Sequence, residues 1–335
     1  MTAPMRDPSA GASPLQAARA AAARGGWGEV RALLAGHPAV GEDAEHTLLL
    51  AEAQLRTGDL AEARALLAPL AARLAAEGNS AFRRRAVNML GAAAFELGEL
   101  AEAETRFQDA LALASAGEDP LTAGRATNNL GMIAHIRGRY DESLARYQLA
   151  VPVYQRTGSL TGLAETHHNM ALALRELAQL DAAEKQERRA IEFAREAGNG
   201  RLLAMAHVGR AELLLRRGNA VVAEAGARLG AEEYAAIPDA VGEADALRLA
   251  GAARTALGNL AGARLALDRA VELASGHGSA LIEAEARAAR ARLAAAEGNL
   301  DGVRADVTAA LALFDRLGAV DDRAALERWL RDVGG

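Results

Sequence analysis

The sequence of 335 residues contains no cysteine, a single lysine and few aromatic residues. The absence of cysteine excludes disulfides, thiolate catalysis and cysteine-ligated zinc. No apolar run approaches the roughly 20 residues that a membrane-spanning helix needs. Aromatic residues make up only 3% of the chain. We therefore expect a core of small and aliphatic side chains, which suits close packing of helices.

Charge is spread evenly, with a net charge of −6 and acidic residues interleaved with arginines along the whole chain. Because no basic stripe is present, a nucleic-acid surface is not expected. The N-terminal stretch MTAPMRDPSAGASP has no hydrophobic signal core and is rich in proline, serine, glycine and alanine. We predict that residues 1–14 form a flexible tail and that the protein is cytoplasmic and does not bind membranes.

A period of 40 residues runs through the sequence. It is marked by Gly58, Gly98, Gly138, Ala178, Gly218, Gly258 and Gly298, and each of these is preceded seven residues earlier by alanine or glycine. A second set of breaks falls halfway, at Gly78, Glu118, Gly158, Gly198, Pro238, Gly278 and Gly318. Glycine closes helices and proline stops them, so the breaks predict helices of roughly 14 to 17 residues in antiparallel pairs.

Small side chains recur where the two helices of a pair should approach most closely. In the third period these are Gly131 on the first helix and Ser143 on the second, and Tyr140 and Tyr147 are expected to fill the space beside them. One hairpin cannot bury its apolar face alone. Neighbouring hairpins must therefore stack, which predicts an all-α solenoid.

These positions resemble the tetratricopeptide repeat. The resemblance rests on Leu130-Gly131, Gly138-Arg139-Tyr140, Ser143, Tyr147 and Ala150. The period is longer than the usual 34 residues and is similar to the 40-residue variety of spindle-orientation adaptors, kinesin light chains and bacterial signalling regulators. The resemblance implies a right-handed α-α superhelical solenoid of about seven regular repeats. It implies little about function, because the repeat is a scaffold for many partners.

The regular solenoid is predicted for residues 44–320. Residues 15–43 resemble a degenerate N-terminal capping hairpin, with Trp27 in the place of a leucine and Pro38 ending the second helix. Residues 321–335 read as a C-terminal capping helix with Leu326, Trp329, Leu330 and Val333 on one face. Arg210 and Arg290 occupy a position that is leucine in earlier repeats, so looser or rotated stacking is expected there.

No enzyme signature is present: the sequence lacks a phosphate-binding glycine loop, a His-Glu-x-x-His motif and a cysteine nucleophile. His167 and His168 are adjacent, and neighbouring residues on a helix point about 100° apart. A third ligand at a matching spacing is missing as well. We therefore predict a non-enzymatic protein without a metal site or cofactor.

The resemblance places the first helix of each repeat on the concave wall of the solenoid. The register then predicts a polar cluster on the groove face of repeats 2 to 4. Its members are asparagines, arginines and histidines that recur on successive first helices: Arg85, Asn88, Arg125, Asn128, Asn129, His135, His168, Asn169 and Arg175. Asparagine amides both donate and accept hydrogen bonds, as a peptide backbone requires, and arginines bind carboxylates bidentately. In relatives, asparagines in this place bind the partner's backbone, which the resemblance carries to Asn129 and Asn169 most directly.

Two other interpretations of these groups remain open. The asparagines can instead bond to the next helix and join neighbouring repeats. In the later repeats Met205, Val208, Leu215 and Leu249 form an apolar set that is suited to an amphipathic helix, a second copy in a homodimer, or the N-terminal tail. The same four residues are equally compatible with the core.

The sequence thus predicts an adaptor that binds an acidic or C-terminal peptide of another protein in repeats 2 to 4. The alternative is a regulatory sensor whose solenoid binds a small signal peptide or metabolite and changes conformation.

Overall fold

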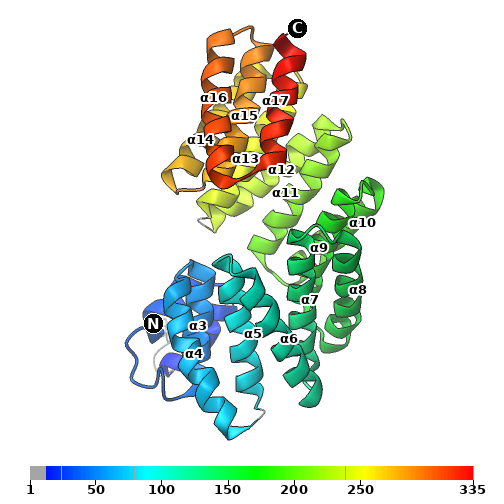
Figure 1. Ribbon diagram of the computed structural model, residues 1–335. Helices are drawn as coiled ribbons and strands as arrows, with labels where there is room; N and C mark the ends of the chain where they lie inside the picture. The colour runs from blue at the N-terminus through cyan, green and yellow to red at the C-terminus, as the bar shows by residue number, and fades with distance from the viewer. Residues whose placement is uncertain (1–12, 24, 79, 238, 335) are drawn as a thin grey trace, which may run out of the picture. The chain divides into compact units, whose positions relative to one another are not determined.

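The computed structural model describes residues 13–23, 25–78, 80–237 and 239–334, and these residues form seventeen helices (Figure 1). Within these ranges the only extended pairing is an isolated bridge between Val40 and Asp43. The all-α fold class is therefore confirmed. The predicted flexible tail comprises residues 1–14, and residues 1–12 of it lie outside the described residues.

Seven helical hairpins follow one another along the chain, and their second helices start at intervals of 40 residues. The first helices are α3 (Ala44–Thr57), α5 (Ala81–Glu96), α7 (Pro120–Ile136), α9 (Leu160–Glu176), α11 (Gly200–Arg216), α13 (Ala240–Ala256) and α15 (Ala280–Ala296). The second helices are α4 (Leu60–Glu77), α6 (Leu100–Ala116), α8 (Tyr140–Thr157), α10 (Leu180–Glu196), α12 (Ala220–Ala236), α14 (Leu260–Gly276) and α16 (Leu300–Leu317). The predicted period and hairpin order are both confirmed.

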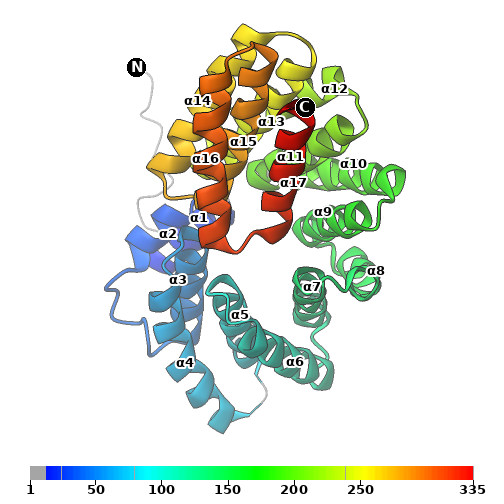
Figure 2. The same ribbon diagram turned by 45° about the horizontal axis from the view of Figure 1, so that its top comes forward.

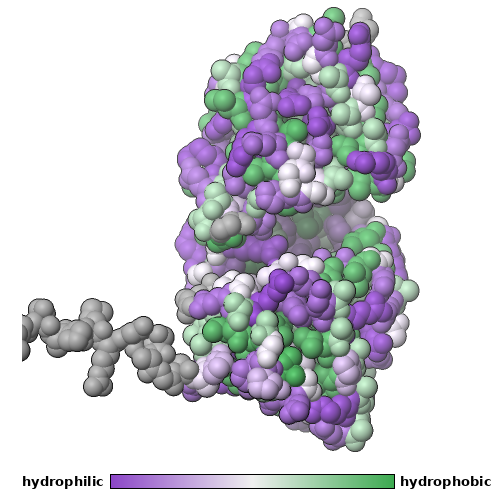
Figure 3. Space-filling view, turned by 90° about the vertical axis from the view of Figure 1, so that its left-hand side faces the viewer, coloured by the Kyte–Doolittle hydropathy of each residue, from purple (hydrophilic) through white to green (hydrophobic). Residues whose placement is uncertain are grey.

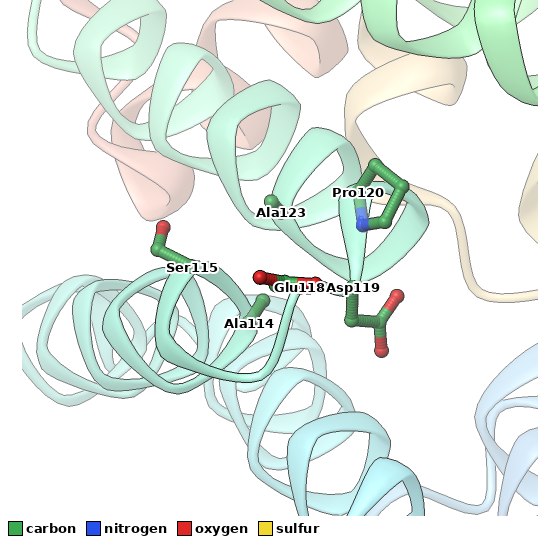
Figure 4. Close-up of a pocket in the computed structure, with 6 residues that line it drawn as sticks. All are labelled: Ala114, Ser115, Glu118, Asp119, Pro120 and Ala123. Carbon is green, nitrogen blue, oxygen red and sulfur yellow. The ribbon is translucent and has the colours of Figure 1, made fainter.

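The turns lie at the predicted breaks because each described break residue has a positive φ. All the break glycines have positive φ, and so do the two described break residues that are not glycine, Glu118 at 50° and Ala178 at 56°. Pro238 lies outside the described residues. Figure 4 shows the turn between α6 and α7, where Glu118 and Asp119 lie beside a pocket of about 290 Å³. Asp119 then caps α7 by accepting the Thr122 backbone N–H at 3.0 Å.

Three hairpins are closed by a glycine on the first helix and a large side chain on the second. The ring of Tyr147 covers Gly131, Phe107 covers Gly91 and Leu267 covers Gly251; a methyl group on any of these glycines would lie within 2.6 Å of its partner. Tyr147 and Phe107 are each only 1% exposed. The predicted close approach at Gly131 is therefore present, and it explains how an alanine-rich sequence fills its interior.

The helices form two compact units, residues 1–166 and 167–335, and the boundary between them falls inside α9. In the first unit α3 contacts α5 and α5 contacts α7; in the second, α11 contacts α13 and α13 contacts α15. No direct contact of this kind joins α4 to α6 or α12 to α14 among the described residues. The first helices therefore line one face of each unit, which can be followed for α5 and α7 in Figure 2.

Shorter elements lie at both ends of the hairpin series. Helices α1 (Pro14–Ala23) and α2 (Trp27–Leu34) bury Ala18, Ala21, Val30 and Leu34 against α3. At the other end α17 (Val320–Gly334) packs on α16 through Leu326, which is 1% exposed. Trp329 is half-buried, with Arg292 5.3 Å from its ring centre, whereas Leu330 is exposed. The Val333 side chain lies outside the described part.

Candidate peptide-binding face

The exposed stripe of the first helices in unit 1 can be read from the burial of α5 and α7. On α7 the accessible side chains follow helical spacing, at Arg125, Asn129, Met132 and Ile136. The matching positions on α5 are Arg85 and Ala92, which are partly exposed, and Met89, which is buried at 9% exposure. We call these seven residues the α5–α7 face. It combines two arginines and an amide with an apolar strip.

This face is concave. Arg56 at the end of α3 lies 4.0 Å from the carboxylate of Glu165 on α9, although α5 and α7 stand between these helices in the stack. Two first helices that are separated by two others can approach in this way only if the surface between them is hollowed. In the view of Figure 3, polar residues and small apolar patches alternate on the surface of the molecule.

Of the predicted site residues, Arg85, Arg125 and Asn129 lie on the α5–α7 face. Arg125 is exposed and makes no ion pair with any residue that the structure describes. Arg85 is partly exposed and lies 3.6 Å from Glu52 on α3. Asn129 is half-buried. These three side chains supply charge and amide groups that a ligand can reach.

Asn128 points the other way from its neighbour. It is 4% exposed and its Oδ1 accepts a hydrogen bond of 3.0 Å from the Thr166 hydroxyl on α9. The second interpretation from the sequence, a bond to the next helix, therefore describes Asn128. The adjacent asparagines thus occupy different environments, because consecutive helical residues point about 100° apart.

Asn88 occupies the position of Asn128 one repeat earlier and is also buried, at 9% exposure. Its Oδ1 has no hydrogen-bond partner in the described part of the chain. His135, near the end of α7, is half-buried and packs edge-on against Tyr140, with ring centres 5.2 Å apart. Burial argues against direct contact of Asn88 or Asn128 with a groove ligand.

The remaining predicted residues, His168, Asn169 and Arg175, belong to unit 2. His168 is 8% exposed and its Nδ1 lies 3.0 Å from the carboxylate of Glu187 on α10. Glu187 is itself fully buried and packs against Gly209 of α11. Asn169 is half-buried. His168 therefore belongs to a buried polar pair, which the sequence signalled only by placing glutamate where other repeats have Phe107, Tyr147 and Leu267.

Arg175 is held in a charged network on the first helices of unit 2. Its guanidinium donates to Glu212 at 2.6 Å and to Glu176 at 3.0 Å. Burial acts to raise the pKa of Glu212, but Arg175, Arg248 and Arg216 together lower it below the ordinary value. Arg248 in turn pairs with Asp245 at 2.6 Å and with Glu285 at 3.1 Å. The charge of Arg175 is therefore compensated within its own unit.

The buried Glu187 predicts a specific pH dependence. Burial raises the pKa of its carboxyl above the ordinary 4.5, although His168 and Arg175 act in the opposite direction. The folded chain thus binds this proton more tightly than the unfolded chain, so stability is lost as pH rises from 4.5 through the raised pKa. We expect Glu187→Gln to be more stable than the wild type at neutral pH and to lose that advantage in acid, as measured by urea unfolding at several pH values.

Glu212→Gln is the control of opposite sign. The pKa of Glu212 is lowered, so its contribution is present above the unfolded pKa and is lost as pH falls through the folded pKa. This variant should be less stable than the wild type at neutral pH, with the difference vanishing in acid. A Glu187→Gln variant that is destabilised equally at every pH would contradict the assignment.

The apolar set of the later repeats belongs to the core. Val208 and Leu249 are buried at 7% and 3% exposure in one cluster, and Met205 and Leu215 pack against it. The alternative that the sequence left open, a core role for these residues, is the one that the burial supports. No described helix combines the length and apolar character that crossing a membrane would require. Within the described ranges no three acidic or histidine side chains converge as metal ligands.

The arginines that replace leucine in unit 2 are accommodated by ion pairs. Arg210 donates to Glu184 at 3.2 Å, and Arg290 binds Asp306 at 2.7 Å and Asp268 at 2.8 Å. Helices α11 and α15 contact the helix before and the helix after them, as α5 and α7 do. Looser or rotated stacking was expected at Arg210 and Arg290. The helices that carry these arginines nevertheless keep the same neighbours as the helices of the earlier repeats.

The repeated hairpins, the left-handed breaks and the small-to-large closure define a helical-repeat protein. Residues 122–196 match the model of the tetratricopeptide repeat. This part of the chain carries the tetratricopeptide repeat that the resemblance in its sequence implied. No curated protein matches it.

Solved structures share this fold at low sequence identity. A Rap protein complexed with competence and sporulation factor is 13% identical, with a TM-score of 0.64 over 96% of each chain. A signal-transduction ATPase with a tetratricopeptide-repeat sensor from Pyrococcus horikoshii is 16% identical, with a TM-score of 0.63 over 91% of this chain and 45% of that one. Aspartyl phosphate phosphatase F from Bacillus subtilis is 14% identical, with a TM-score of 0.54 over 74% of this chain and 63% of that one. At these identities the likeness concerns the fold.

Proposed function

We propose that the protein is a non-enzymatic adaptor and that its α5–α7 face binds an extended, acidic peptide of a partner protein. The observation that carries the proposal is Arg125, an exposed arginine on a concave face with no ion-pair partner in the described chain. A guanidinium in this setting is available for bidentate pairing with a carboxylate. Asn129 lies one turn further along α7 and offers a donor and an acceptor to a peptide backbone.

The apolar part of the face fits the same ligand. Met132 is half-buried and Ile136 is 53% exposed, so both retain surface that a side chain of the peptide can cover. The peptide is thus held by charge at Arg85 and Arg125, by its backbone at Asn129 and by apolar contact beyond them. This arrangement of charged, amide and apolar groups favours a peptide with an acidic segment and an aliphatic residue near it.

A second candidate is a regulatory sensor in which the same face takes a small signal peptide. It is favoured by the likeness to the Rap protein whose solved structure contains competence and sporulation factor. An adaptor and a sensor differ in the consequence of binding. Peptide that alters hydrogen exchange far from the α5–α7 face would support the sensor, whereas protection confined to the face would support the adaptor.

The proposal predicts different responses from the amide and the charge. After affinity capture identifies a partner segment, its synthetic peptide is titrated against variants by fluorescence anisotropy. Asn129→Ala should weaken binding by about fivefold to tenfold, the loss of roughly 1 kcal/mol of hydrogen bonding, at low and high salt alike. Arg125→Gln should weaken it at low salt, with a loss that shrinks as salt is added.

Arg73→Gln is the matched control, because Arg73 is an exposed arginine on α4 in the same unit and also lacks an ion pair within the described residues. It should leave binding unchanged. Stability separates a groove role from a structural one: alanine is the better helix former, so Asn129→Ala should keep or slightly raise the melting temperature. Unchanged peptide binding in both Asn129→Ala and Arg125→Gln would refute the α5–α7 face as the site.

A further inference from the structure

Three arginines converge on one buried glutamate in unit 2. Arg188 donates from Nη2 to Glu184 Oε1 at 2.8 Å, and Arg210 reaches the same oxygen at 3.2 Å. Arg217 donates to Oε2 at 2.6 Å and also lies 2.9 Å from Asp181. Glu184 is only 8% exposed. One carboxylate therefore gathers three guanidiniums that belong to α10, α11 and the turn that follows α11.

These side chains line a pocket. Its volume is about 400 Å³, and it is closed beside them by Leu214 and by Asn219, the residue that caps the start of α12. A pocket of this size is suited to a small molecule. The first backbone N–H groups of α12 add partial positive charge on that side.

The cluster carries more positive than negative charge. Arg188, Arg210 and Arg217 face Glu184 and Asp181, which leaves one positive charge in excess, and the Asp181 side chain is 83% exposed to screening solvent. Hydrogen bonding from Arg188 is the main cause that lowers the pKa of Glu184. This carboxylate therefore stays ionised in mild acid.

The second arginine-for-leucine position of the chain provides an internal contrast. There Arg287 and Arg290 face three carboxylates, on Asp268, Glu283 and Asp306. That cluster has an excess of negative charge, although its arginine occupies the equivalent helical position. An arginine at this helical position can therefore be paired by carboxylates without three arginines gathering around one acid.

The guanidiniums also have more N–H donors than the neighbouring carboxylates can accept. Three arginines offer fifteen N–H groups in total, and the acceptors around them are two carboxylates. The Nε of Arg210 is buried without a hydrogen-bond partner within the described chain. Phosphate and carboxylate oxygens are the acceptors that match such planar donor pairs.

We propose that this pocket binds a small oxyanion with two or more negative charges, such as a phosphorylated or polycarboxylate metabolite. The ligand pairs with Arg188, Arg210 and Arg217 on their side facing away from Glu184, which keeps the three guanidiniums together. This site lies within unit 2 and shares no residue with the α5–α7 face. The two proposals therefore stand or fall separately.

Isothermal titration at constant ionic strength tests the site with pyrophosphate and citrate as probes. Saturable binding of either probe to the wild-type chain is expected, and the tighter probe identifies the phosphate or the polycarboxylate class. Arg188→Gln should weaken that binding at least tenfold. The Arg188 side chain is 61% exposed, so this change should leave the fold intact.

Arg210→Leu restores the residue found at Leu50, Leu90 and Leu130 and should also weaken binding at least tenfold. Glu184→Gln removes the competing negative charge and should tighten it. Arg228→Gln, which alters an arginine paired with Glu232 outside the pocket, should have no effect. The site is overturned if neither probe binds the wild type, or if Arg188→Gln binds the preferred probe as tightly as the wild type does.

Discussion

A chain that lacks residues 99–138 and carries Arg84→Gly is expected to fold into a stack with one hairpin fewer. The deletion removes α6 and α7 and joins α5 to α8 through a turn that keeps the sequence Gly98-Arg139. Because contacts in a solenoid are between nearest neighbours, α5 then takes the place of α7. Gly91 comes to face Tyr147 as Gly131 does in the full chain, and Asn88 comes to the position where Asn128 accepts the Thr166 hydroxyl.

The substitution at residue 84 follows from one local difference between the repeats. Arg84 is buried in unit 1 with its guanidinium 3.0 Å from Asp119, which the deletion removes. The equivalent residue of α7 is Gly124, where a methyl group would lie 3.3 Å from the ring of Tyr154. Without Arg84→Gly, the deletion removes Asp119 from the buried Arg84 and places this side chain against that ring, and we expect a clearly less stable chain.

Circular dichroism and urea unfolding measure both effects. The 40-residue deletion with Arg84→Gly should keep the helicity per residue of the full chain and a cooperative transition. A deletion of 30 residues, 99–128, is the control, because it joins helices out of phase and should lose helicity well beyond the residues removed. Equal helicity loss in the two deletions would contradict the 40-residue period as the folding unit.

The sequence was sufficient to predict the hairpins because their signals are local and repeat. The break positions hold even where glycine is absent: Glu118 and Ala178 adopt the left-handed backbone that the period assigns to them. The pairing of Gly131 with Tyr147 was predictable for the same reason, since it connects two helices of one hairpin.

The exposed side of each first helix was harder to predict, because asparagine is compatible with both a buried and an exposed position. The position of Asn88 and Asn128 is occupied by Leu48 in the preceding repeat and by Val208 in a later one, and these apolar residues were the signal of burial. Asn129, one residue further, remains accessible. The adjacent asparagines were therefore separable in principle by the residues of neighbouring repeats.

Partners that are distant in the sequence could not be predicted. Asn128 bonds to Thr166, 38 residues away, and Arg210 bonds to Glu184, 26 residues away. Acidic residues and arginines are interleaved along the whole chain, so no pattern singles out one acid as the partner of one arginine. The oxyanion pocket depends on several such pairs at once, and its geometry appears only when the helices are packed.

Replacing Gly131 by alanine is expected to destabilise the chain although alanine is the better helix former. The new methyl group would lie 2.6 Å from Cε1 of Tyr147, whose ring is 1% exposed and cannot move outward freely. Overpacking of a core costs about 1 to 3 kcal/mol, against a gain of roughly 1 kcal/mol in helix propensity. Tyr147→Ala should cost more, about 3 to 5 kcal/mol, because it removes the ring and leaves a cavity.

The equivalent pair in the first hairpin supplies the rescue, since Ala51 and Leu67 close α3 against α4 without glycine or an aromatic ring. The double variant with Gly131→Ala and Tyr147→Leu should therefore be more stable than the sum of the two single changes predicts. Gly226→Ala on α12 is the matched control, because its methyl group would meet the nearest atom at 3.5 Å, an ordinary contact. That variant should gain up to about 1 kcal/mol. Urea unfolding measures these four variants and Tyr147→Leu alone, and a Gly131→Ala chain as stable as Gly226→Ala would mean that the Tyr147 ring does not set the spacing of α7 and α8.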